Sequence, residues 1–155
     1  MARLICALIL VLLVATPSLG QQSLVGTYKL VSIVLEVDGT PTTQNMGKAP
    51  RGYLVLTPTR LICFMTAENR KFGTSVDEKA ALFDTLAGYA AVYRVEGDKL
   101  IYTADVSWTE NEKGNTAVET WQLSWNRFTT TLGPIPFPRD PSKKLIRREV
   151  WEKIE

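Results

Sequence analysis

The stretch YAAVYRVEGDKLIYTADVSW, residues 89–108, contains two runs of alternating side chains around the turn sequence Glu-Gly-Asp-Lys. Side chains that repeat at every second position are typical of β-strands with one buried face. A short polar segment with glycine between two such runs is typical of a hairpin turn. Residues 89–108 therefore predict an antiparallel hairpin.

The same pattern recurs along the chain and predicts eight strands. They cover residues 25–37, 53–57, 61–66, 89–95, 100–108, 117–125, 127–132 and 144–154. Most neighbours are joined by short links, and regular short strands of this kind favour an antiparallel sandwich or barrel. The fold class is therefore all-β.

One segment between the third and fourth predicted strands has a helical pattern. Ser75 and Glu78 have the spacing of a capping box. Apolar side chains then repeat at helical spacing at Val76, Ala80, Phe83 and Ala87. Gly88 is placed to end the helix. We expect one short helix that either covers an open barrel end or packs against the outer wall.

Residues 1–20 have the pattern of a signal peptide. Arg3 precedes an apolar run over residues 4–15, which is shorter than the roughly 20 residues of a membrane span. Small side chains occupy the −3 and −1 positions before Gln21. We expect a secreted or periplasmic protein whose folded domain is residues 21–155, with no stable membrane insertion after cleavage. An uncleaved anchor is the alternative.

Composition excludes several classes of function. The chain has 155 residues and no histidine, which removes Ser-His-Asp and Cys-His catalysis and every histidine-based metal site. Lys and Arg number 18 against 16 Asp and Glu, so the charge gives no case for nucleic-acid binding. No phosphate loop, paired cysteine motif or calcium loop is present. We expect no metal and no cofactor, and we expect Cys63 to be a buried core residue.

Strand alternation predicts an aromatic interior. The aromatic side chains placed on the inward faces are Tyr93, Tyr102, Trp108, Trp121 and Trp125. Eight strands enclose enough room for side chains or for one small ligand. An aromatic wall with a few polar groups suits a small apolar ligand. A completely filled core is the alternative.

Glu119 is the most distinctive polar residue on these faces. It shares its face with Trp121 and Leu123, where burial raises a carboxyl pKa unless a cation pairs with it. Three arginines are possible partners: Arg94, Arg147 and Arg148. Glu119 is then either an acid–base group or polar anchor in a cavity, or a structural ion pair or rim carboxylate.

A basic cluster lies near the C-terminus, with acidic residues close to it. The basic residues are Lys143, Lys144, Arg147 and Arg148, and the acidic ones are Glu149 and Glu152. Because the charges balance, we expect a solvated edge strand here rather than a polyanion site.

Four short motifs occur in a fixed order along the chain. They are Gly26–Ser32, Gly52-Tyr53-Leu54 with Leu56-Thr57-Pro58, Gly88-Tyr89 with Tyr93 and Gly97-Asp98, and Val150–Lys153. Together they resemble the bacterial and fungal lipocalin-like domains of the calycin type over residues 24–153. The resemblance implies a small antiparallel up-and-down barrel, here of eight strands, whose interior holds a hydrophobic molecule. Tyr102 and Glu119 stand where many members carry histidine and arginine.

These observations favour a monomeric carrier of a small hydrophobic molecule with no chemistry of its own. The expected ligand-binding residues are Tyr53, Tyr93, Tyr102, Trp108, Glu119 and Trp121. The alternative is a cofactor-free isomerase or cyclase acting on a polyketide- or terpenoid-like substrate, because resembling barrels hold such substrates in reactive shapes. Glu119 is the one catalytic candidate in that case.

Overall fold

The computed structural model of the protein describes residues 19–42 and 46–155. Most of the predicted signal peptide, residues 1–18, lies outside the described residues. The described elements are α1 (Leu19–Leu24), β1 (Gly26–Val37), β2 (Thr40–Thr42), β3 (Arg51–Leu56), β4 (Arg60–Thr66), α2 (Val76–Phe83), β5 (Leu86–Glu96), β6 (Lys99–Ser107), the 3-10 helix η2 (Glu110–Glu112), β7 (Thr116–Ser124), β8 (Arg127–Phe137) and β9 (Asp140–Lys153).

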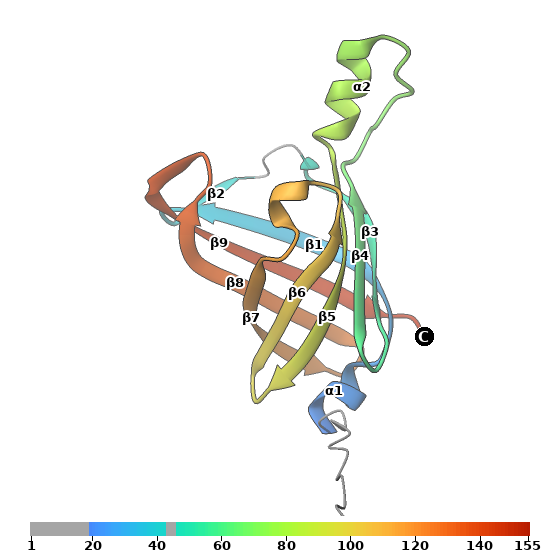
Figure 1. Ribbon diagram of the computed structural model, residues 1–155, viewed down its shortest axis with the longest axis vertical. Coiled ribbons are helices and arrows are strands. Elements are labelled where there is room, and N and C mark those ends of the chain that lie inside the picture. The colour runs from blue at the N-terminus through green and yellow to red at the C-terminus, as the bar shows by residue number, and fades with distance from the viewer. Residues whose placement is uncertain (1–18, 43–45) are drawn as a thin grey trace, which may run out of the picture.

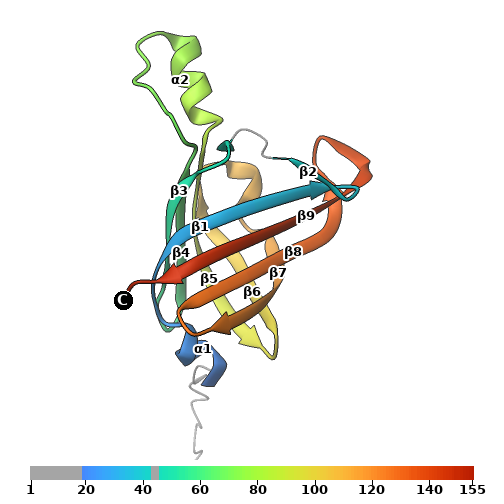
Figure 2. The ribbon, with the colours of Figure 1, turned by 180° about the vertical axis from the view of Figure 1, so that it is seen from behind.

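The strands form one antiparallel sheet that closes on itself (Figure 1, Figure 2). Each strand from β3 to β8 pairs with the next along the chain, and β1 pairs with both β3 and β9. The short β2 extends only the end of β1, where Val37 pairs with Thr40. The sheet has nine described strands, but β2 pairs only with β1 and lies outside the closed ring, so the barrel itself has eight strands. The expected up-and-down barrel is confirmed.

Alternate side chains of the barrel strands point inward and form one core. Its least exposed members are Tyr28, Leu56, Leu61, Cys63, Ala91, Leu100, Phe128 and Trp151. Cys63 is buried as the sequence predicts, and burial raises the pKa of its thiol well above the usual range. The thiol therefore stays protonated and acts as a small apolar group.

Helix α1 lies at one end of the barrel (Figure 1). Leu24 is completely buried there, and its carbonyl accepts a hydrogen bond of 2.7 Å from the Tyr28 hydroxyl. The side-chain nitrogen of Gln21 donates to the carbonyls of Pro58 and Tyr93 at 2.6 and 3.3 Å. These contacts attach α1 to the core and to the strand turns at this end.

The capping box predicted for α2 is present. The Ser75 hydroxyl accepts from the backbone N–H of Glu78 at 3.2 Å, and the Glu78 carboxylate accepts from the N–H of Ser75 at 3.0 Å. The predicted end at Gly88 is wrong, because α2 ends at Phe83. The chain already pairs with β4 from Leu86 onward, so tertiary pairing overrides the helical spacing.

Helix α2 lies between β4 and β5, which are the third and fourth of the strands that the sequence predicts. It neither covers a barrel end nor packs its length against the wall. No residue of α2 is buried, and the helix projects beyond the barrel in both views (Figure 1, Figure 2). Among the described residues, no helix is long and apolar enough to cross a membrane.

A bulge in β6, where Asp105 is the extra residue opposite Ala90 and Ala91 of β5, changes which side chains of β6 face inward. Tyr93 pairs with Tyr102, but the register shifts between Ala90 and Ala91, so that Tyr89 pairs with Ser107. An extra residue on one strand reverses the alternation beyond it. The side chains at the end of β6, and that of Trp108 after it, therefore point to the opposite face from the one that regular alternation predicts.

Candidate functional site

Strands β7, β8 and β9 place six inward-facing side chains in two rows. The first row is Glu119, Leu132 and Arg147, and the second is Trp121, Thr130 and Glu149. Paired strands lie about 4.8 Å apart, and residues opposite one another on one face are neighbours. The register therefore gathers two carboxyl groups, a guanidinium and an indole inside the barrel.

Arg147 is the partner of Glu119. Its Nη2 donates to Oε1 of Glu119 at 2.6 Å, and the Tyr102 hydroxyl donates to the same oxygen at 2.7 Å. Nη2 also lies 3.4 Å from the Tyr102 oxygen. Glu119 is buried, so this charge-assisted pair lies in surroundings that screen it weakly. Of the three arginines that the sequence leaves open, the structure selects Arg147.

Glu149 is a second buried carboxyl group beside the same arginine. Its Oε1 lies 3.0 Å from Nε of Arg147, and its Oε2 accepts from the Trp151 indole at 3.1 Å. Burial raises the pKa of Glu149, and the effect exceeds the opposing one of Arg147, while Glu119 raises it further. Burial alone would lower the pKa of Arg147, but Glu149 and Glu119 raise it well above its usual range. Arg147 therefore remains charged.

Two tyrosine rings continue this polar cluster across the interior. Tyr89 and Tyr102 are stacked, with ring centroids 5.7 Å apart and planes 12° from parallel. Burial is the main cause that raises the pKa of both hydroxyls. The neighbouring Tyr102 raises the pKa of Tyr89 further, and Glu119 raises the pKa of Tyr102 further. Both tyrosines are therefore neutral hydrogen-bond donors at ordinary pH.

Three buried polar atoms of the cluster have no hydrogen-bond partner among the described residues. They are Nε1 of Trp121, Nε of Arg147 and Oε1 of Glu149. The last two lie 3.0 Å apart, but their geometry does not make a hydrogen bond. A buried polar atom without a partner costs about 1–3 kcal/mol, so such atoms are usually satisfied by water or by a ligand. This cluster therefore has unused hydrogen-bonding capacity.

The interior beside this cluster is not completely filled. The Arg147 side chain is 23% exposed although it points into the barrel. Other inward-facing side chains are also partly exposed where they pack on the core: Ala87, Tyr89, Ala117, Trp121 and Leu123. Because these inward-facing side chains keep exposed surface, the space next to the polar cluster is accessible to solvent.

Four of the six predicted ligand-binding residues lie inside the barrel. They are Tyr93, Tyr102, Glu119 and Trp121. Tyr102 and Glu119 bond to each other directly, and Trp121 occupies the neighbouring row. Tyr93 is the cross-strand neighbour of Tyr102, but its hydroxyl makes no hydrogen bond to the cluster and donates to the carbonyl of Thr57 at 2.7 Å, near the end where α1 lies.

Tyr53 and Trp108 lie on the outer surface, so the expectation that they line the interior is wrong. Tyr53 is 52% exposed and pairs with outward-facing Lys29 and Phe64. Trp108 is 42% exposed because it follows the reversed end of β6. Its indole donates to the carbonyl of Phe83 at 3.2 Å.

Trp125 is also misplaced by the alternation rule. It occupies the turn between β7 and β8 with a φ of 59°, and it is 98% exposed. Two-residue hairpin turns require positive φ values. The turn therefore removes Trp125 from the inward face.

The expectation that Arg147 and Glu149 lie on a solvated strand is wrong. Both alternate with Leu145 and Trp151 on the inward face of β9. That spacing is visible in the sequence and is the signal that identifies them. The balance of basic and acidic residues does not distinguish a surface from an interior, because the same ion pair forms in either place.

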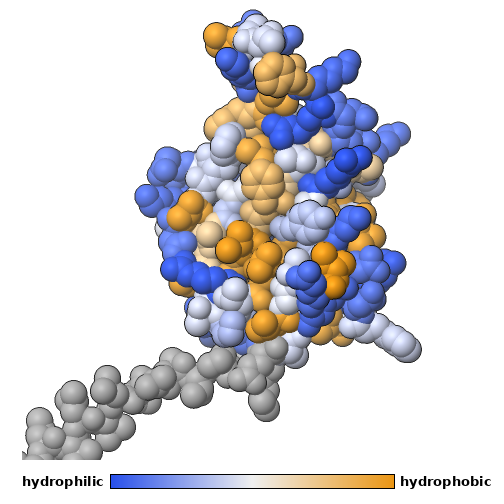
Figure 3. Space-filling view, turned by 90° about the vertical axis from the view of Figure 1, so that its right-hand side faces the viewer, coloured by the Kyte–Doolittle hydropathy of each residue, from blue (hydrophilic) through white to orange (hydrophobic). Residues whose placement is uncertain are grey.

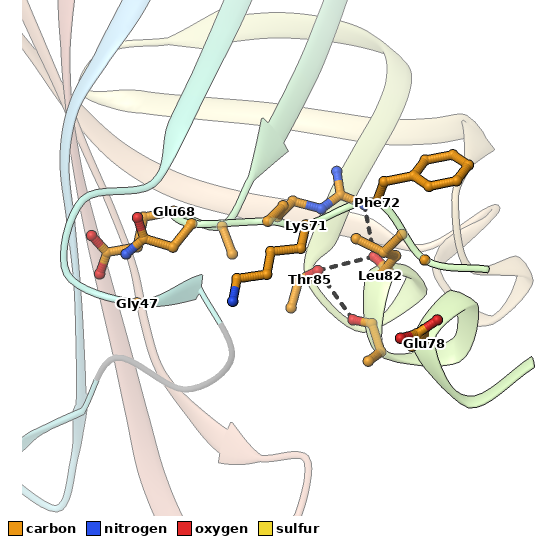
Figure 4. A pocket seen from close by; sticks show the side chains of 12 residues that line it. Gly47, Glu68, Lys71, Phe72, Glu78, Leu82 and Thr85 are labelled. Carbon is orange, nitrogen blue, oxygen red and sulfur yellow. Dashed lines mark hydrogen bonds between the residues drawn. The ribbon is translucent and has the colours of Figure 1, made fainter. Parts of the chain in front are cut away.

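Among the described residues, Tyr93 borders a small outer pocket of about 140 Å³, and the other outer pockets contain none of the four interior candidates. One, of about 410 Å³, lies between Gly47 and α2 (Figure 4). Lys71 extends into this space, whereas the Phe72 ring points away from it (Figure 4). The carboxylate of Glu68 accepts from the Lys48 N–H at 2.6 Å here. This pocket lies between exposed loop segments and has no buried polar side chain in its lining.

A second outer pocket, of about 330 Å³, lies on the wall formed by β4, β5 and β6. Apolar side chains gather on this face below α2 (Figure 3). The exposed ones that line the pocket are Ile62, Phe64, Val106 and Trp108. The misplaced Trp108 therefore belongs to this outer groove.

The site carries no arrangement for a metal ion. Within residues 19–42 and 46–155, no three His, Cys, Asp or Glu side chains lie close enough to hold one. The interior carboxylates Glu119 and Glu149 flank Arg147 instead. Chemically, the cluster provides donors and acceptors for a polar group inside an otherwise apolar barrel.

The raised pKa of Glu149 predicts a pH dependence of stability. The folded protein holds this proton more tightly than the unfolded chain, so the free energy of unfolding falls as pH rises from about 4.5, the ordinary value. Glu149→Gln cannot lose a proton and should lack this part of the decline. Urea unfolding of both proteins between pH 4.5 and 8 measures the difference. The prediction is contradicted if the two proteins differ in free energy of unfolding by the same amount at every pH.

Comparisons with curated proteins and with solved structures find no match to this chain. The sequence pattern of the lipocalin-like domain matches residues 25–154, which include every strand of the barrel. The closed barrel and this match agree, and the chain belongs to the lipocalin-like domain family.

Proposed function

We propose that the protein binds a small hydrophobic molecule inside its barrel. The observation that carries this proposal is the accessible interior next to the Glu119–Arg147–Glu149 cluster, where inward-facing side chains keep exposed surface. A lipocalin-like barrel is suited to small-molecule binding. Pockets with apolar walls and a few placed polar groups are the usual sites for such ligands.

The interior residues have distinct roles in this proposal. Trp121 and the stacked pair of Tyr89 and Tyr102 provide flat apolar area for a ligand. Arg147 and Glu149 provide polar atoms that orient it. Tyr53 and Trp108, on the outer surface, have no part in the interior site.

We also propose that the protein is exported and works as a secreted or periplasmic carrier. The support is the signal-peptide pattern of residues 1–20. Cleavage before Gln21 falls within α1 and keeps the buried Gln21 and Leu24 in the mature chain. Export therefore leaves the contacts at this barrel end in place.

Native mass spectrometry of the protein from its own host tests both proposals. We expect the mass of residues 21–155 plus one small molecule, which dissociates on denaturation. A chain that retains Met1 contradicts export. A native sample without any bound small molecule, prepared without organic solvent or detergent, contradicts the binding proposal. The two masses are independent, so one proposal fails without the other.

A further inference from the structure

We infer that the barrel interior selects an uncharged apolar molecule that carries a hydrogen-bond acceptor, such as a ketone or another carbonyl group. The inference rests on the proposed function, because it concerns the same interior. It adds the chemical class of the ligand. Hydrocarbons and carboxylate-bearing molecules such as fatty acids are the classes that it excludes.

The first argument is the unused donor of Trp121. Nε1 of Trp121 is buried and has no acceptor among the described residues, whereas Nε of Arg147 is buried, makes no hydrogen bond and faces Oε1 of Glu149 at 3.0 Å. An indole N–H and an Arg Nε–H donate and cannot accept. A hydrocarbon in the barrel leaves the Trp121 N–H unpaired, whereas a carbonyl oxygen next to Trp121 accepts from it. The acceptor therefore recovers a hydrogen bond that the protein alone does not make.

The second argument is the charge around Arg147. Its guanidinium lies 2.6 Å from Glu119 and 3.0 Å from Glu149. The single cation of this cluster thus faces two carboxyl groups. A ligand carboxylate would compete with Glu119 for Arg147 and would lie close to that negative charge. Burial of an ion without a free counter-ion is unfavourable, so the site disfavours an anionic ligand.

The third argument is the state of Glu149. Burial raises its pKa, so the group holds its proton to a higher pH than an exposed glutamate does. Its Oε1 has no hydrogen-bond partner among the described residues. When protonated there, the carboxyl group donates, and it becomes a further donor for a carbonyl oxygen. When ionised, it adds to the repulsion of anions.

Three matched probes test the inference on the full-length folded protein. The ketone 2-acetylnaphthalene, the alkene 2-isopropenylnaphthalene and the anion 2-naphthoate have similar size and shape. Equilibrium dialysis at pH 7 gives their dissociation constants. We expect the ketone to bind about tenfold more tightly than the alkene, as one additional good hydrogen bond predicts. We expect naphthoate to bind most weakly.

Each result of this comparison decides the question. Equal binding of ketone and alkene contradicts the inference and leaves the proposed function intact. Tightest binding of naphthoate contradicts it in favour of an anion site. Failure of all three to bind contradicts the proposed binding of apolar molecules as well.

Two Trp→Phe variants locate the effect. Trp121→Phe keeps an aromatic ring and removes Nε1, so it should reduce the preference for ketone over alkene by about threefold to tenfold. Trp108→Phe is the control, because Trp108 lies in the outer groove. Loss of affinity in Trp108→Phe alone places the probes outside the barrel and contradicts the inference. If Trp121→Phe does not fold, the three-probe comparison in the unchanged protein still decides.

Discussion

Arg147→Met is expected to destabilise the protein by about 3–5 kcal/mol. The substitution keeps much of the side-chain length and removes the charge that faces Glu119 and Glu149. Both carboxyl groups stay buried, and each then has to ionise without a counter-ion or to remain protonated at neutral pH. Urea denaturation at pH 7, analysed by linear extrapolation, measures the loss in the free energy of unfolding.

The neighbouring Arg148 provides a matched control for this prediction. Arg148 is exposed on the outer side of β9, so Arg148→Met should change the free energy of unfolding by less than about 0.5 kcal/mol. The double variant Arg147→Met/Glu119→Gln should recover part of the loss, because one unpaired charge is then absent. Equal effects of Arg147→Met and Arg148→Met would show that the interior ion pair does not stabilise the fold.

Trp151→Ala is the second substitution with a large expected effect, again about 3–5 kcal/mol. Trp151 is 0% exposed and is the largest fully buried side chain of the core. Its indole also donates to Oε2 of Glu149 at 3.1 Å. Truncation therefore leaves a cavity and removes a hydrogen bond from a buried carboxyl group, which adds to the loss.

Trp125→Ala is the corresponding control, since the same atoms are removed from a side chain that is 98% exposed. We expect a change within about 0.5 kcal/mol. Thermal and urea unfolding of the two variants, followed by far-ultraviolet circular dichroism, give the comparison. A Trp151→Ala protein as stable as Trp125→Ala would contradict the packing that the structure shows.

The positions of the strands and of the helix start are local properties of the sequence. Alternation around Gly97 identified the hairpin of β5 and β6, and the Ser75–Glu78 spacing identified the start of α2. Both depend on residues that are close in the chain. The inward placement of Tyr102, Glu119 and Trp121 follows from the same alternation, because no bulge lies between them and the hairpin turns that set their register.

Two of the errors occur where pairing with another strand changes a local rule. The register shift between Ala90 and Ala91 reverses the faces of the side chains at the end of β6 and places Trp108 on the outer surface of the barrel. Pairing of Leu86 with Thr66 ends α2 earlier than its apolar spacing suggests. Bulges and pairing of this kind depend on the partner strand, which a single segment of sequence does not specify.

The sequence by itself determined the all-β class, the number of strands in the barrel and the aromatic character of its interior. These follow from side-chain periodicity and turn residues, which act over a few neighbouring positions. Only the tertiary structure decided that Arg147, rather than Arg94 or Arg148, pairs with Glu119, and that Glu149 joins them. The reason is that β7 and β9 meet only through β8, in a register that closure of the barrel fixes.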